Sequence, residues 1–239
     1  MDTLNSTTQV ASEHKTRGRV KKFLFRSASS IVVIAILAQV TYTYSGSNQW
    51  EKLWERNGVT VYSMKSPGSN FKKFKAIWRV HTTLSKFVMF ARYEDDPTIG
   101  YDMKDIEIQS DKLIWSTWKQ EFPSPLKKRE FVVKNEFSQD PRTKELLFTV
   151  TADPDKIPPN DCCIRLQTMT NSWRLTPLKN GETEIEWFVD MDLGGFLPYF
   201  VQNAEQPDGM FYFASKVQSY LDQEKYKNAR VDWVEEAQP

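Results

Sequence analysis

The chain has 239 residues, 40% of them hydrophobic and 26% charged, so it can hold one domain of about 180 residues with a tail, or two small domains. Residues 1–26 carry six Lys or Arg and two acidic residues, which leaves 26 basic against 29 acidic residues in the rest of the chain. Nucleic-acid binding normally depends on a basic face, so a net charge of about −3 outside the tail excludes DNA or RNA as an expected partner.

An apolar segment follows the basic tail. Residues Phe23–Tyr44 give about 22 positions, enough to cross a membrane at about 1.5 Å per residue, with Arg26 placed to snorkel. The segment fits either an uncleaved signal anchor or a cleaved signal peptide. The long basic lead-in favours the anchor, while Ser45-Gly46-Ser47 keeps cleavage open. A first helix of a soluble fold is a third interpretation.

These observations predict four regions: a basic disordered tail (1–26), a transmembrane anchor or signal peptide (27–47), one domain (48–225) and a C-terminal tail (226–239). The positive-inside rule leaves the tail in the cytoplasm and sends the domain to the other side, which is the periplasm in a bacterium. Cleavage would instead release a secreted or periplasmic soluble domain.

The two cysteines, Cys162 and Cys163, are adjacent. Neighbours on a strand point to opposite faces, so a bridge between them would be strained. We therefore expect no disulfide and two small, half-buried side chains.

The first half of the domain alternates helices and strands. Gln49–Arg56 is predicted to be a short helix that ends at Asn57-Gly58. A hairpin follows from Val59 to Thr82 around the turn at Ser66–Ser69, and Thr83–Tyr93 has helical spacing. Six further strands are then predicted: Tyr101–Gln109, Lys112–Phe122, Lys128–Ser138, Lys144–Ala152, Cys162–Leu175 and Thr183–Leu193.

A long helix closes the domain. Gly194-Gly195 ends the last strand, and Tyr199–Tyr220 is predicted to be helical, with Pro207-Asp208-Gly209 kinking or splitting it. One face of this helix carries Phe200, Ala204, Phe211, Ala214, Val217 and Leu221.

The order of elements predicts an α+β fold: a curved antiparallel sheet of about eight or nine strands with a long C-terminal helix across its mouth. One helix cannot fill the whole concave side of such a sheet, so an internal apolar cavity is expected. An apolar ligand would gain about 25 cal/mol for every Å² of apolar surface removed from water there.

Several sequence pieces, in this order, resemble the START domain, the lipid-transfer domain named after steroidogenic acute regulatory protein. The similarity covers about Trp50 to Leu221. Its pieces are Trp50, Gly58-Val59-Thr60-Val61-Tyr62, Phe74-Lys75-Ala76, the stretch from Pro123 to Val132 (similar to P-x-x-x-R-D-F-V), Arg165, Trp173-Arg174-Leu175-Thr176-Pro177, and Gly194 to Pro198 leading to Asn203.

The resemblance implies a helix-grip fold with an internal site for one lipid, whether phospholipid, fatty acyl or sterol-like, and with the C-terminal helix as its lid. We also expect a membrane as a partner and a monomer as the working form. Two positions depart from the pattern: Glu130 replaces an Asp, and Asn135 stands where sterol-carrying members place an Arg. The head group of the lipid therefore stays open.

Arg129 is the polar candidate for ligand binding, because a guanidinium held among strands needs a carboxylate or phosphate partner. The alternative is a salt bridge with Glu121 or Glu130 that only fixes the strand. The apolar candidates for ligand binding are Trp115, Phe196, Phe200, Ala204, Phe211, Ala214 and Val217. Ordinary core packing is the alternative for the helix residues among them.

Catalytic motifs are absent from the sequence: there is no Gly-x-Ser-x-Gly, no metal-ligand cluster, and the two histidines are His14 and His81. Asp190 and Asp192 share one strand face, but no third acid or His accompanies them. We therefore expect no enzyme, metal or cofactor. The alternatives to lipid binding and transfer are a helix-grip hydrolase or cyclase acting on an apolar substrate, and an interaction domain that fills its own cavity.

Overall fold

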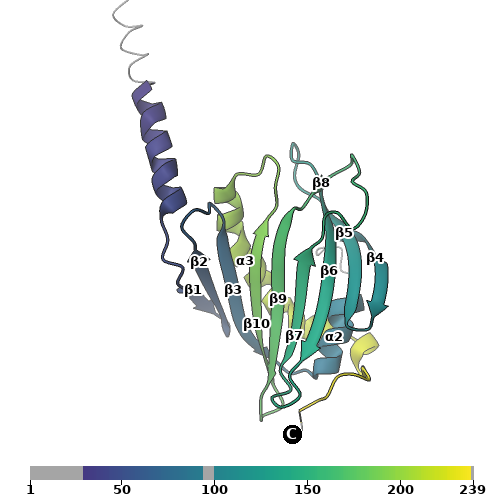
Figure 1. The fold of residues 1–239 in the computed structure, drawn as a ribbon. Helices are drawn as coiled ribbons and strands as arrows, with labels where there is room; N and C mark the ends of the chain where they lie inside the picture. Colours follow the sequence, from purple (N-terminus) through teal and green to yellow (C-terminus); the bar gives the residue numbers. More distant parts are fainter. Residues whose placement is uncertain (1–28, 94–99, 238–239) are drawn as a thin grey trace, which may run out of the picture. The chain divides into compact units, whose positions relative to one another are not determined.

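The computed structural model describes residues 29–93 and 100–237 (Figure 1). The chain divides into two compact units, Met1–Ser45 with Pro67–Ser69, and Gly46–Ser66 with Asn70–Pro239.

In the first unit, residues 29–44 are helical, and their apolar side chains are exposed, Ile31 and Ile34 among them. Across the described parts of the chain, no helix has both the length and the apolar character that a membrane span requires. Residues 23–28 of the predicted apolar segment lie outside the described residues.

The second unit is built on one sheet with the strand order β1-β2-β3-β10-β9-β7-β6-β5-β4, in which β8 pairs with β6. All pairs are antiparallel except β6 with β8. The strands are β1 (Glu51–Arg56), β2 (Val59–Lys65), β3 (Lys72–Val80), β4 (Tyr101–Ser110), β5 (Leu113–Gln120), β6 (Arg129–Gln139), β7 (Leu146–Ala152), β8 (Ile164–Arg165), β9 (Thr168–Pro177) and β10 (Thr183–Asp192). The helices are α2 (Leu84–Tyr93), α3 (Tyr199–Leu221) and the short 3-10 helix η1 (Glu224–Tyr226).

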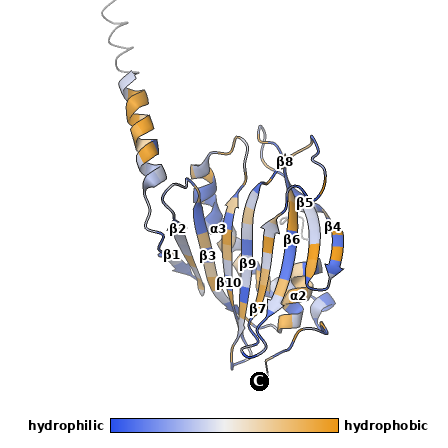
Figure 2. Cartoon of the chain, viewed as in Figure 1, coloured by the Kyte–Doolittle hydropathy of each residue, from blue (hydrophilic) through white to orange (hydrophobic). Residues whose placement is uncertain are grey.

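The helices α2 and α3 lie on the same face of the sheet, behind it in the view of Figure 1. Hydropathy alternates along several strands of this sheet (Figure 2). In β3, for example, Phe74, Ala76, Trp78 and Val80 are buried, whereas the residues between them keep more exposed surface. We call the face that carries these four side chains the inner face.

The short helix predicted for Gln49–Arg56 is wrong, because Glu51–Arg56 forms β1. The Asn57-Gly58 pair that was interpreted as a helix end is a hairpin turn, with φ values of 47° and 76°. Positive φ at both central residues is typical of the type I′ turn, which joins antiparallel strands directly. Arg56 accordingly pairs with Val59.

The strand predicted for Cys162–Leu175 is two strands, β8 and β9, and the cysteines lie before both of them. Cys162 and Cys163 form a disulfide, which corrects the expectation of two free thiols. That expectation assumed strand geometry, whereas both residues lie in a turn, so they do not point to opposite faces of a sheet.

The closing helix α3 is continuous from Tyr199 to Leu221, so the split predicted at Pro207 does not occur. Pro207 is itself buried, on the face that also carries Met210, Ala214 and Val217. Packing of this face against the domain offsets the hydrogen bond that proline cannot donate.

Residues of the predicted C-terminal tail pack on the domain. Tyr226 is buried, and Trp233 contacts Phe137 with ring centroids 5.8 Å apart. The carboxylate of Glu236 accepts hydrogen bonds from the backbone N–H groups of Leu84 and Ser85 at 2.9 and 2.8 Å. This segment therefore satisfies the free N–H groups at the start of α2.

Candidate functional site

Side chains from neighbouring strands form one aromatic row across the inner face. Phe137, Phe148, Trp173 and Trp187 occupy paired positions on β6, β7, β9 and β10. Their successive ring centroids lie 4.3, 5.1 and 5.5 Å apart, with interplanar angles of 9°, 22° and 11°. The four rings thus stack face to face across four neighbouring strands.

Two small residues continue the row toward the sheet edge. Trp187 pairs with Ala76 on β3, Ala76 pairs with Val61 on β2, and Val61 pairs with Trp54 on β1. Ala76 and Val61 have no exposed surface. Ala76 and Val61 leave a gap in the row of large rings, because their side chains are small. The gap allows α3 to approach the sheet closely, and the helix packs against β2 and β3 there.

Two aromatic residues of α3 contact the row on either side of the gap. Phe211 meets Trp54 edge-on at 5.6 Å, and Phe213 lies 4.9 Å from Trp187. Such aromatic pairs contribute about 0.5–1.5 kcal/mol beyond the area they bury. They fix the position of α3 along the sheet.

The helix leaves part of the inner face uncovered. Trp173 and Trp187 lie on β9 and β10, in the middle of the sheet, yet both are only half-buried, as is Asn171. Side chains on the inner face of central strands retain accessible surface only where nothing packs on them. The two indoles therefore keep accessible surface on the inner face.

Several polar atoms of the inner face have no hydrogen-bond partner among the described residues. They include the indole Nε1 of Trp78, Trp173 and Trp187 and the Oδ1 of Asn171. A buried donor or acceptor left unpaired costs about 1–3 kcal/mol. The interior thus offers apolar surface together with a few unused hydrogen-bonding groups.

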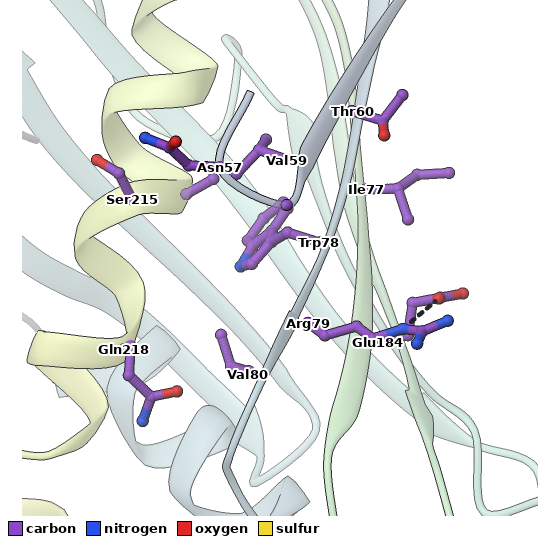
Figure 3. Close-up of a pocket in the computed structure, with 12 residues that line it drawn as sticks. Asn57, Val59, Thr60, Ile77, Trp78, Arg79, Val80, Glu184, Ser215 and Gln218 are labelled. Carbon is purple, nitrogen blue, oxygen red and sulfur yellow. Dashed lines mark hydrogen bonds and ion pairs between the residues drawn. The ribbon is translucent and has the colours of Figure 1, made fainter. Parts of the chain in front are cut away.

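An open cleft with a volume of about 630 Å³ lies between α3 and the β1–β2 turn (Figure 3). It is lined by Asn57, Gly58, Val59, Thr60, Ile77, Trp78, Arg79, Val80, Glu184, Ala214, Ser215 and Gln218. This volume is within the range of about 300–1,000 Å³ that is typical of small-molecule sites.

Amide side chains fasten both ends of α3 to the sheet. Gln202 donates to the Met191 carbonyl and accepts from the Leu193 N–H, while Asn203 accepts from the Lys72 N–H at 2.9 Å. Near the other end, Gln218 accepts from the His81 N–H at 2.9 Å. Displacement of α3 as a lid would have to break these bonds.

Arg129 is fully buried, and its partners are backbone carbonyls. It donates to the carbonyls of Leu193 at 3.1 Å, Gly194 at 2.9 Å and Lys127. Burial lowers the pKa of the Arg129 guanidinium. The side chain therefore holds the linker between β10 and α3.

The salt bridge considered for Arg129 is wrong, since both acids have other partners. Glu130 binds Arg165 at 2.7 Å, and Glu121 binds Lys128 at 2.6 Å. Arg165 also donates to the carbonyls of Pro154, Ile157 and Pro158, which fixes the loop before β8.

The structure brings together only part of the predicted apolar set. Phe211, Ala214 and Val217 lie on the half-buried or buried side of α3, whereas Phe196 is 91% exposed and Phe200 63% exposed. Ala204 is exposed too. In the first turn of α3, the buried residue that binds β10 is Gln202.

Trp115 is not on the inner face. It pairs with Lys134, whereas the neighbouring Asn135 shares the face of Phe137. Its indole donates to Asp153 at 2.8 Å, and Lys156 lies 3.9 Å from its ring centroid. The inner tryptophan of this strand is Trp118, which stacks on Phe131 at 4.8 Å.

The two aspartates on β10 have structural partners. Asp190 pairs with Lys73 at 2.7 Å, and Asp192 accepts from the Gly194 N–H at 2.8 Å. His81 is exposed, with its Nε2 3.7 Å from Glu182. Within residues 29–93 and 100–237, no group of three or more His, Cys, Asp or Glu side chains could hold a metal ion.

No known family profile matches the chain. In sequence, the chain is similar to the uncharacterized protein PA1579 of Pseudomonas aeruginosa strain PAO1, with 23% identity over 73% of this chain and 89% of that protein.

The fold is similar to that of several solved domains. A STAR-related lipid transfer protein fragment from Xanthomonas axonopodis aligns with a TM-score of 0.64 and 18% identity, over 73% of this chain and 99% of that one. Human StAR-related lipid transfer protein 5 aligns with a TM-score of 0.62 and 20% identity, over 83% and 98%. The domain has the START fold. The predicted helix-grip class is confirmed, with ten strands instead of eight or nine.

In this START fold, replacing Arg129 with Met should remove the donors of three backbone carbonyls and lower the free energy of unfolding by about 3 kcal/mol or more. Urea denaturation measures this loss, and hydrogen exchange should show faster opening at residues 193–200. Arg174→Met is the control, because Arg174 forms only an exposed pair with Glu145 at 3.6 Å and should cost less than about 1 kcal/mol. Unchanged stability of Arg129→Met, with ligand binding lost, would instead make Arg129 a ligand-binding residue.

Proposed function

We propose that the domain binds one lipid-like molecule against the inner face, beside α3, and transfers it between membranes. The observation that carries this proposal is the accessible surface of Trp173 and Trp187 in the middle of the sheet. The START fold adds support, because similar solved domains are named lipid transfer proteins.

The aromatic row suits an apolar ligand for a physical reason. Its stacked rings cover one another's faces and present their edges to the interior, and covering these edges gains about 25 cal/mol for every Å² of apolar surface removed from water. A flexible acyl chain or a ring system can lie along such a surface. A strongly hydrated ligand would gain little there.

Binding and delivery, not chemistry, are the activities that these residues support. His81 is the only histidine in the described part of the chain, and it lies in the exposed segment after β3, with its imidazole toward Glu182. The unpaired polar groups of the inner face are indoles and the amide of Asn171, and neither kind is an acid or a base.

Full-length protein purified in mild detergent should retain one lipid-like molecule, detected by native mass spectrometry and identified after organic extraction. Trp187→Ala should lower its occupancy about tenfold or more, because a buried aromatic contact contributes roughly 1.5–3 kcal/mol. Trp115→Ala, on the outer face, is the matched control and should retain the ligand. Circular dichroism should show both variants folded.

A wild-type protein that is reproducibly empty, and that takes up no lipid analogue, would contradict the binding proposal. Equal occupancy in Trp187→Ala and Trp115→Ala would place the ligand away from the aromatic row.

For transfer, we propose that residues 196–201, at the start of α3, contact the membrane surface. Phe196 and Phe200 expose most of their surface, and Val201 is 36% exposed. Large exposed aromatic side chains gain free energy when they enter the interface of a bilayer.

Phe196→Asp combined with Phe200→Asp should slow the transfer of a fluorescent lipid between vesicles by about tenfold or more, while equilibrium binding of the lipid stays unchanged. A dequenching assay with donor and acceptor vesicles measures the rate. Tyr212→Asp, at an exposed aromatic residue of α3 outside this segment, is the control. An unchanged transfer rate in the double variant would contradict the proposed contact.

We also propose that residues 23–44 tether the domain to a membrane, with the domain on the non-cytoplasmic side. The support is the row of exposed apolar side chains in the helix of residues 29–44, preceded by a basic tail. Cleavage of this segment would give a free domain in the same compartment.

Ile34→Arg with Leu37→Arg should move the full-length protein out of the carbonate-washed membrane fraction, since each Arg at the centre of a span costs about 2.5–3.5 kcal/mol. Ile108→Arg, at an exposed apolar residue of the domain, is the matched control and should not change fractionation. Wild-type protein found only in the soluble fraction with its N-terminus intact would contradict the tether.

A further inference from the structure

The cleft beside the β1–β2 turn contains a buried donor with nothing to bind. Trp78 lines the cleft and is only 3% exposed, and its indole Nε1 has no partner among the described residues. In Figure 3 the indole extends from β3 toward α3, with its nitrogen on the side of Ser215 and Gln218.

The neighbouring polar side chains form other bonds, and none of them pairs with this donor. The Ser215 hydroxyl donates to the Tyr212 carbonyl at 2.7 Å. The Gln218 amide binds the His81 backbone on one side and Asp222 on the other. The Trp78 N–H is thus a buried donor without a partner, on a residue that lines the cleft.

The charges of the cleft cancel. Arg79 is the only cation among its lining residues, and its guanidinium binds Glu184 at 3.1 Å. An anionic ligand group would therefore lose its hydration without gaining an unpaired cation in the wall, and this desolvation costs free energy. An uncharged group avoids that cost.

The cleft shares Trp78 with the inner face, which also carries the aromatic row. Trp78 lies two residues beyond Ala76 on β3, and Ala76 pairs with Trp187. Residues two apart on a strand share a face, so Trp78 lies on the same face as the row.

From these observations we propose that the cleft is the polar-end site of the ligand, and that it selects an uncharged lipid whose oxygen accepts a hydrogen bond from the Trp78 indole. An indole N–H donates and does not accept, so the ligand group must be an acceptor, such as an ester carbonyl. This inference rests on the proposed function and adds the class of lipid to it.

The test uses full-length protein labelled with 15N in its indoles, and ligands delivered from cyclodextrin. Methyl palmitate should shift the Nε1–H resonance of Trp78, whereas hexadecane, which has no acceptor, should bind about two- to tenfold more weakly. Trp78→Phe should lower the affinity for methyl palmitate to that for hexadecane and leave hexadecane binding unchanged. Trp115→Phe, on the outer face, should keep the wild-type ratio.

The following results would contradict the inference. A ratio of affinities that is unchanged in Trp78→Phe, or an unmoved Trp78 resonance in the wild-type protein, would overturn the role of the indole. Tighter binding of palmitate or lysophosphatidate than of methyl palmitate would overturn the selection of an uncharged lipid. If neither methyl palmitate nor hexadecane binds, the proposed function fails, and this inference fails with it.

Discussion

The stacking of Phe137, Phe148, Trp173 and Trp187 depends on strand register, and the rest of the domain depends on that stack. Side chains alternate between the faces of a strand, so a slip of one residue in any pair would move a ring to the outer face. The same register places Ala76 next to the last ring, where α3 can approach closely. One set of strand pairings thus forms the apolar surface and positions α3 against it.

The helix α3 is fixed to the sheet and covers only part of its inner face. Amide side chains fasten α3 to β3 and β10, and Arg129 holds the linker before it by binding carbonyls. Because the helix packs against β2 and β3, the indoles of the central strands stay partly accessible. A domain built only for stability would bury these rings and pair their N–H groups. Apolar surface and unused donors together are what the lipid-binding proposal explains.

Local pattern was enough to predict the β2–β3 hairpin, α2 and most strands, but the site depends on register between strands distant in sequence. The turn at Asn180-Gly181 illustrates the difference. A two-residue turn would pair Trp173 with Phe188, whereas Thr183 pairs with Pro177, and Trp173 therefore faces Trp187. At Asn57-Gly58, where the turn does have two residues, the sequence suggested a helix end instead. Trp115 was likewise predicted to bind the ligand, although Trp118 is the inner-face tryptophan of β5, because one strand alone does not show which face is concave.

The central claim is that a lipid lies on the inner face, along the aromatic row. Isotope-filtered nuclear Overhauser spectra of the full-length protein with a bound lipid measure this contact directly. The account predicts cross-peaks from the methylene protons of the lipid to the ring protons of Trp173 and Trp187, and none to Trp115. Cross-peaks to Trp115 alone, or contacts confined to exposed Phe196 and Phe200, would contradict it.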